Sequence, residues 1–80
     1  MPQFFLHLRD DAGELLDPDG AELADTAAVE RCAMEAARGV MSGDLANGLL
    51  DLRYRIDVEN ERRDIVHTLH FRDAVSIIEF

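Results

Sequence analysis

Three segments of this chain alternate apolar and other residues with a period of two, the pattern of a half-buried β-strand. They span residues 3–9, 52–58 and 65–71. Successive side chains of a strand point to opposite faces, so each segment places one set of positions on an apolar inner face. A shorter strand over residues 14–17 is expected to return from the turn at residues 10–13, which combines aspartates with a glycine.

The stretch after Asp25 predicts an amphipathic helix. Asp25 or Thr26 can cap its first turn by accepting a hydrogen bond from a free backbone N–H. Ser42-Gly43 is a plausible end, although Leu45 and Ala46 could extend the helix by another turn. The apolar stripe recurs at three- and four-residue steps and consists of Val29, Cys32, Ala33, Ala36, Ala37, Val40 and Met41.

These elements follow one another in the order β-β-α-β-β. A chain of 80 residues forms one domain, here residues 1–80, with a thin margin of stability. We therefore expect an α+β fold of two layers, in which an antiparallel sheet of three to four strands packs on one helix. Strands 52–58 and 65–71 should form the second hairpin, and the pattern leaves open which strand lies beside strand 3–9.

The C-terminal segment, residues 74–80, is too apolar for a free end. We expect it to pack on the domain as a helical turn or short strand, or to be buried in a second subunit. Its apolar residues are therefore candidates for an interface: Val75, Ile77, Ile78 and Phe80.

The charge of the chain narrows the range of partners. Acidic residues outnumber basic ones 17 to 8, and the net charge is −9 at pH 7. Such a charge repels phosphate backbones and anionic lipid, so neither nucleic acid nor membrane is expected as a partner. Solubility is the simplest interpretation of the acidity, and an acidic partner-binding face is the alternative.

The cysteine content, the N-terminal sequence and the distribution of apolar residues bear on the cellular compartment. Cys32 is the single cysteine, so the chain can form no internal disulfide, and its place on the apolar stripe predicts a buried, unreactive thiol. The N-terminus lacks the basic region and apolar run of a signal peptide, and no segment approaches the roughly 20 apolar residues of a membrane span. We therefore expect a cytoplasmic protein.

Two histidines are the main candidates for chemistry. His7 and His70 are both expected on the outward face of the sheet, each two residues before an arginine. If the first and last strands are neighbours, the two imidazoles could approach each other with Asp10 or Asp73 nearby, and such a set could bind zinc or relay a proton. We favour the alternative that both are ordinary strand residues. The sequence has no nucleophile elbow or phosphate loop, so we expect no catalytic residue, no cofactor and no enzymatic activity.

Several short motifs resemble a known family. Residues 4–10, Phe-Phe-Leu-His-Leu-Arg-Asp, and residues 20–25, Gly-Ala-Glu-Leu-Ala-Asp, precede an alanine-rich helix, and residues 71–74 read Phe-Arg-Asp-Ala. Together they resemble DUF6894, a family of short bacterial domains of unknown function common in alphaproteobacteria. The resemblance covers essentially the whole chain and implies no activity or functional residue. The turn Asn60-Glu61-Arg62-Arg63 departs from the Asp-Gly type of turn expected there.

The leading hypothesis for function is a non-enzymatic protein-interaction or regulatory module, which binds a protein partner or a second copy of itself in a homodimer. One alternative rests on a similarity of layout to antitoxin domains with a degraded ribonuclease-H-like fold, and it would make the chain an inhibitor of its partner. A histidine-based metal-binding protein is the other alternative.

Overall fold

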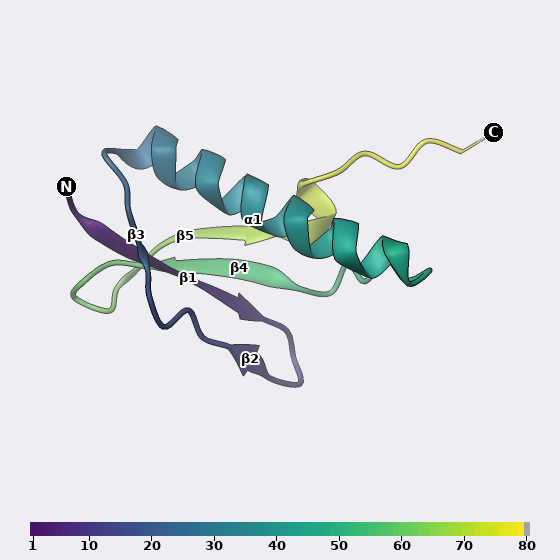
Figure 1. The fold of residues 1–80 in the computed structure, drawn as a ribbon, viewed down its shortest axis with the longest axis horizontal. Helices are drawn as coiled ribbons and strands as arrows, with labels where there is room; N and C mark the ends of the chain where they lie inside the picture. Colours follow the sequence, from purple (N-terminus) through teal and green to yellow (C-terminus); the bar gives the residue numbers. More distant parts are fainter. Residues whose placement is uncertain (80) are drawn as a thin grey trace.

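The protein is an open antiparallel sheet with one long helix lying across one of its faces (Figure 1). A computed structural model describes residues 1–79. The expected α+β architecture, an antiparallel sheet packed on one helix, is confirmed. Its elements are β1 (Gln3–Arg9), β2 (Glu14–Leu15), β3 (Ala21–Glu22), α1 (Thr26–Ala46), β4 (Arg55–Glu59), β5 (Ile65–His70) and the short 3-10 helix η1 (Phe71–Asp73).

Strand β1 lies inside the sheet, whose order is β2-β1-β4-β5, and β3 pairs with the first residues of β1. The sheet thus has five strands rather than three to four. The expected return strand over residues 14–17 is only two residues long. Beyond it, the carboxylate of Asp17 accepts the backbone N–H of Leu6 (3.1 Å), so a side chain replaces the ladder hydrogen bond there. Pro18 has no N–H to continue the ladder.

Strand β4 begins at Arg55, three residues later than the pattern predicted. The cause is a local turn in which Asp51 Oδ1 accepts the backbone N–H of Arg53 (3.0 Å). Aspartate side chains favour such turns because they offer the backbone a partner outside the sheet.

A β-bulge reverses two of the predicted side-chain directions in β5. Val58 pairs with His67 and Glu59 pairs with Ile65, so Val66 is an extra residue. Ile65 therefore shares the outward face of Glu59, and Val66 lines a hollow together with residues of β1 and α1. The period-two alternation of residues 65–71 by itself predicts the opposite, with Ile65 on the inner face and Val66 on the outer face.

Helix α1 is capped by Asp25, whose carboxylate accepts the backbone N–H of Ala28 (2.8 Å). It continues past Ser42-Gly43 to Ala46, as the alternative reading allowed. Cys32 is only partly buried, which corrects the expectation of full burial. Neither helix in the described part of the chain combines the length and apolar character needed to cross a membrane.

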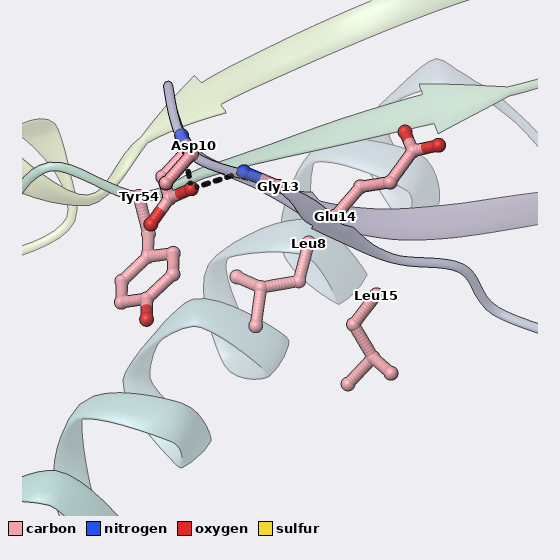
Figure 2. A pocket seen from close by; sticks show the side chains of 7 residues that line it. Leu8, Asp10, Gly13, Glu14, Leu15 and Tyr54 are labelled. Atoms are coloured by element: carbon pink, nitrogen blue, oxygen red, sulfur yellow. Dashed lines mark hydrogen bonds between the residues drawn. The ribbon is translucent and has the colours of Figure 1, made fainter.

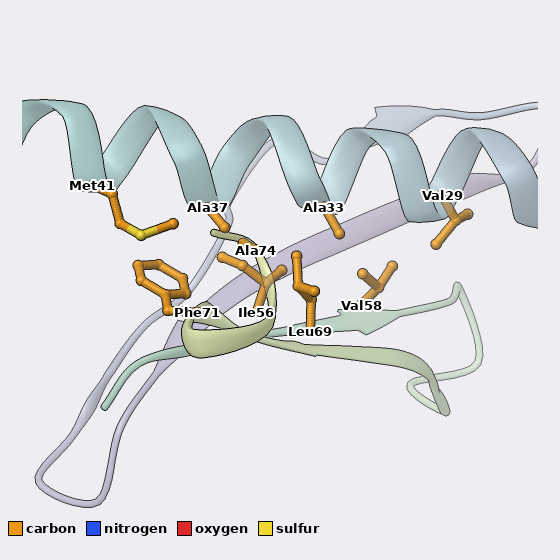
Figure 3. Close-up of a cluster of buried hydrophobic side chains, with 9 residues drawn as sticks. All are labelled: Val29, Ala33, Ala37, Met41, Ile56, Val58, Leu69, Phe71 and Ala74. Carbon is orange, nitrogen blue, oxygen red and sulfur yellow. The ribbon is translucent and has the colours of Figure 1, made fainter. Parts of the chain in front are cut away.

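The core lies between α1 and the strands β4 and β5 (Figure 3). Two alanines of α1 are fully buried, and their small side chains let the helix approach the sheet closely. The bulkier side chains of the core come mainly from the sheet and η1. The cluster consists of Val29, Ala33, Ala37, Met41, Ile56, Val58, Leu69, Phe71 and Ala74.

Candidate functional site

The helix leaves part of the apolar inner face of the sheet uncovered. It packs on β4 and β5, whereas the inward residues of β1 (Phe4, Leu6 and Leu8) are only partly buried. Apolar surface of β1 therefore extends beyond the edge of the helix. Side chains in this position are available to a partner without any rearrangement of the core.

An open hollow of about 400 Å³ lies at the end of β1, and we call it the hairpin groove. Its large apolar residues are Leu8, Leu15 and Tyr54, which extend toward the helix side of the sheet (Figure 2). Leu8 and Leu15 are paired across β1 and β2, so they share one face. Leu15 is 70% exposed, which is unusual for a leucine on the inner face of a sheet.

The turn between β1 and β2 fixes the position of Leu15. Asp10 Oδ1 accepts the backbone N–H groups of Ala12 (2.8 Å) and Gly13 (2.9 Å), and the N–H of Asp10 donates to the carbonyl of Gly13 (3.0 Å). All three of these residues also line the groove. These hydrogen bonds hold the turn in one conformation, so the groove has a fixed border at this end.

Acidic residues follow the groove along the chain. Residues 10–25 contain seven carboxylates and no basic residue, and we call this segment the acidic edge. It includes β2 and β3, which pair with opposite ends of β1. The seven residues are Asp10, Asp11, Glu14, Asp17, Asp19, Glu22 and Asp25.

The opposite, outward face of the sheet carries a polar network centred on Asp57. This buried carboxylate accepts hydrogen bonds from Thr68 Oγ1 (2.8 Å), Arg9 (3.1 Å) and Arg55 (3.1 Å). Arg9 also binds Glu14 (2.7 Å), which connects the network to the acidic edge. Burial raises the pKa of Asp57, but the three donors outweigh burial, and its pKa lies below the ordinary value.

His7 lies beside this network, with both ring nitrogens near partners. Nδ1 accepts the backbone N–H of Asp17 (3.1 Å), and Nε2 lies 3.6 Å from Glu59 Oε2. The Asp17 carboxylate is held by the N–H groups of the loop and of β1, and these bonds outweigh its burial and lower its pKa. A hollow of about 740 Å³ opens over His7 on this face. Most of its polar side chains already bind other groups of the protein, which fits a structural network.

The structure separates the two histidines that the sequence suggested might meet. Strand β4 lies between β1 and β5, so the first and last long strands are not neighbours. His7 is 6% exposed, whereas His70 is exposed on the edge strand. Asp10 belongs to the β1–β2 turn, and Asp73 lies in η1. Within residues 1–79, no group of three or more histidine, cysteine or acidic side chains is placed to hold a metal ion.

The C-terminal segment is divided between the core and the surface. Val75 packs partly against the core, whereas Ile77 and Ile78 are 58% and 81% exposed. Phe80 lies outside the described residues. The ribbon after η1 runs away from the sheet and helix (Figure 1).

Sequence reasoning missed the hairpin groove and the role of Asp57. The adjacent leucines at positions 15 and 16, set in an acidic segment, were a usable signal, because consecutive leucines cannot both face the core of a strand. Asp57 is preceded by Arg55 on the same expected face of its strand, and this spacing indicated a charge pair.

Comparison with known protein families gives a match that covers most of the chain. The description of the matching family is "Domain of unknown function (DUF6894)", and residues 3–72 are matched. This confirms the family resemblance noted in the sequence. No curated protein and no solved structure matches the chain.

Proposed function

We propose that this chain, which belongs to the DUF6894 family of domains of unknown function, is a cytoplasmic, non-enzymatic protein-interaction module. Its docking surface is the hairpin groove. The observation that carries the proposal is Leu15, which is 70% exposed on the inner face beside Leu8 and Tyr54. Covering such apolar surface is favourable by about 25 cal/mol per Å², so a complementary side chain gains free energy by entering the groove.

The larger hollow over His7 supports the same choice by contrast. Its central polar groups, among them His7, Arg9 and Asp17, already bind other groups of the protein. A ligand there would have to break these bonds, whereas a ligand in the hairpin groove can displace water from the apolar side chains of Leu8, Leu15 and Tyr54 without breaking such a network.

Binding by variants of the groove tests the proposal. Once a partner is isolated from the native host, we expect Leu15→Ser to weaken its affinity by about tenfold or more, because the serine removes apolar contact from the groove. Leu49→Ser is the matched control, since Leu49 is similarly exposed (58%) but lies after the helix. Equal affinity of wild type and Leu15→Ser, with both folded by NMR, would contradict the proposal.

A homodimer is a second candidate, favoured by the exposed C-terminal isoleucines. Ile77 and Ile78 follow the buried Ala74 and partly buried Val75, so a second copy could extend an apolar contact that begins in the core. Sedimentation equilibrium tests it: a dimer in wild type that dissociates more readily in Ile78→Ser is expected. A monomer at high concentration counts against this candidate and leaves the groove proposal intact.

A further inference from the structure

We infer that the polypeptide segment entering the hairpin groove is both apolar and positively charged, with lysine or arginine beside its apolar anchor residues. This inference rests on the proposed function and specifies the partner of the same site. It follows because the groove has an apolar floor, formed by Leu8, Leu15 and Tyr54, and an acidic surround, formed by Asp10 and the rest of the acidic edge.

The floor selects apolar side chains. Leu8, Leu15 and Tyr54 supply it, and the volume of about 400 Å³ lies in the lower part of the range of about 300–1,000 Å³ typical of small-ligand pockets. The groove thus accommodates a few side chains of a partner.

The surround selects positive charge. Asp10 lines the groove and is followed by the exposed Asp11, whereas the Glu14 carboxylate points to the opposite face and binds Arg9 (2.7 Å) (Figure 2). The acidic edge that continues from the groove has no basic residue between Arg9 and Arg31. A bound cation near these carboxylates is attracted over a Debye length of about 10 Å at 0.1 M salt.

The nearby arginines do not cancel this field. Arg53, next to the groove residue Tyr54, is bound by Asp51 (2.9 Å). Arg9 and Arg55 are bound by Glu14 and Asp57 on the opposite face of the sheet. The acidic edge therefore keeps an excess of negative charge.

Other occupants fit less well. Nucleic acid and anionic lipid are repelled by an acidic edge. A second copy would bring the same acidic edge and its own net charge of −9 to the contact. A basic segment of a different protein is the occupant that satisfies both the floor and the surround.

Three synthetic peptides test the inference. They share the same leucine anchors and carry lysine, glutamine or glutamate at the intervening positions. Each is titrated into 15N-labelled protein at 50 and 300 mM NaCl. We expect the lysine peptide to shift the amide signals of Leu8, Leu15 and Tyr54, to bind about tenfold tighter than the glutamine peptide, and to weaken as salt rises. The glutamate peptide should not bind.

Variants separate the two contributions. Leu15→Ser should weaken both the lysine and the glutamine peptide. The variant Asp11→Asn should weaken the lysine peptide several-fold and leave the glutamine peptide unchanged, because Asp11 belongs to the acidic edge but does not line the groove. Asp73→Asn is the charge-matched control, because Asp73 lies in η1, outside the acidic edge.

The possible results distinguish the inference from the proposed function. Equal, salt-independent binding of the lysine and glutamine peptides in the groove overturns the inference and leaves the docking function standing. The inference is also overturned if the lysine peptide shifts only amide signals of the acidic edge and binds Leu15→Ser as tightly as wild type. Such binding would be non-specific electrostatic attraction. If no peptide perturbs the groove, both the inference and the proposed docking function fail.

Discussion

The backbone N–H of Asp17 donates a hydrogen bond to Nδ1 of His7 (3.1 Å), and this bond ties the loop between β2 and β3 to the middle of β1. The carboxylate of Asp17 reinforces the connection by accepting the N–H of Leu6. The ring of Phe5 stacks on His7 with the planes 9° apart. Since β2 and β3 are two residues each, the loop bonds hold the acidic edge in place.

We expect His7→Ala to lower the free energy of unfolding by about 1–3 kcal/mol, because it removes a buried acceptor and the ring that packs beneath the loop. Urea denaturation measures the loss, and faster hydrogen exchange at the Asp17 amide locates it. His70→Ala is the control and should change stability by less than about 0.5 kcal/mol, since His70 is exposed. Unchanged exchange at Asp17 in His7→Ala would show that the bond does not hold the loop.

Asp57→Asn tests the polar network of the outward face. We expect a loss of about 1–3 kcal/mol at pH 7, because the amide cannot replace a carboxylate that accepts from Thr68 and two arginines. Glu14→Gln is the control: Glu14 also binds Arg9 but its side chain is 49% exposed, so a change within about 1 kcal/mol is expected.

The lowered pKa of Asp57 also predicts how the free energy of unfolding depends on pH, and the same two variants test it. The pKa of Asp57 is lower in the folded protein than in the unfolded chain, where it is about 3.9. Its contribution is therefore complete above the unfolded pKa and is lost as the pH falls through it toward the folded pKa. Wild type and Glu14→Gln should lose stability more steeply below about pH 5 than Asp57→Asn. Parallel curves of unfolding free energy against pH would contradict the role given to Asp57.

The elements that could be predicted are those governed by local periodicity. Strand β1 and the buried face of α1 follow from their spacing of apolar residues, and the Asp25 cap follows from its place before the helix. The proximity of His7 and His70 could not be predicted in the same way, because it depends on strand order. The strand that separates them, β4, pairs with both of their strands.

Features set by single hydrogen bonds and by helix placement also escaped prediction. The bulge at Val66 reverses the faces on which Ile65 and Val66 lie, and the alternating pattern of apolar residues gives no sign of it. The hairpin groove exists because α1 packs mainly on β4 and β5 and leaves the inner face of β1 partly uncovered. The periodicity of apolar residues predicts helices and strands but does not indicate which strands a helix covers. The groove could therefore be found only from the packing of the folded protein.

Gly20 is required both by its backbone and by its surroundings. Its φ is +70°, and a Cβ atom there would lie 2.9 Å from the carbonyl oxygen of Phe4. We expect Gly20→Ala to lower the free energy of unfolding by more than about 1 kcal/mol, because both the strained φ and the backbone contact oppose the methyl group.

Two other glycines separate these causes. Gly48 has φ +79° with open space around it, so Gly48→Ala reports the backbone effect alone. Gly13 has open space and no positive φ, so Gly13→Ala should have little effect or stabilise slightly. Thermal denaturation should rank the losses Gly20 > Gly48 > Gly13, and an equal loss for Gly20 and Gly48 would show that the contact with Phe4 relaxes.

The β4–β5 turn holds an arginine in a conformation that favours glycine. Arg63 has φ +67°, the one non-glycine residue with positive φ in the described part of the chain. The turn is fixed by Asn60, whose side-chain oxygen accepts the N–H groups of Arg62 (2.9 Å) and Asp64 (3.0 Å). The unusual sequence of this turn thus retains the left-handed position that an Asp-Gly turn would give to glycine.

We expect Arg63→Gly to raise the free energy of unfolding by up to about 1 kcal/mol. Removing the Cβ relieves the strain of the left-handed conformation in the folded protein. Glycine also makes the unfolded chain more flexible, which opposes this gain, but the relief of strain is the larger effect. Arg62→Gly is the charge-matched control. Its φ is not positive, so the same substitution should lower stability by about 0.5–1 kcal/mol. Both variants remove one arginine from the same turn, so the difference between their denaturation midpoints isolates the backbone term. If Arg63→Gly is no more stable than Arg62→Gly, the hydrogen bonds of Asn60 already absorb the strain at Arg63.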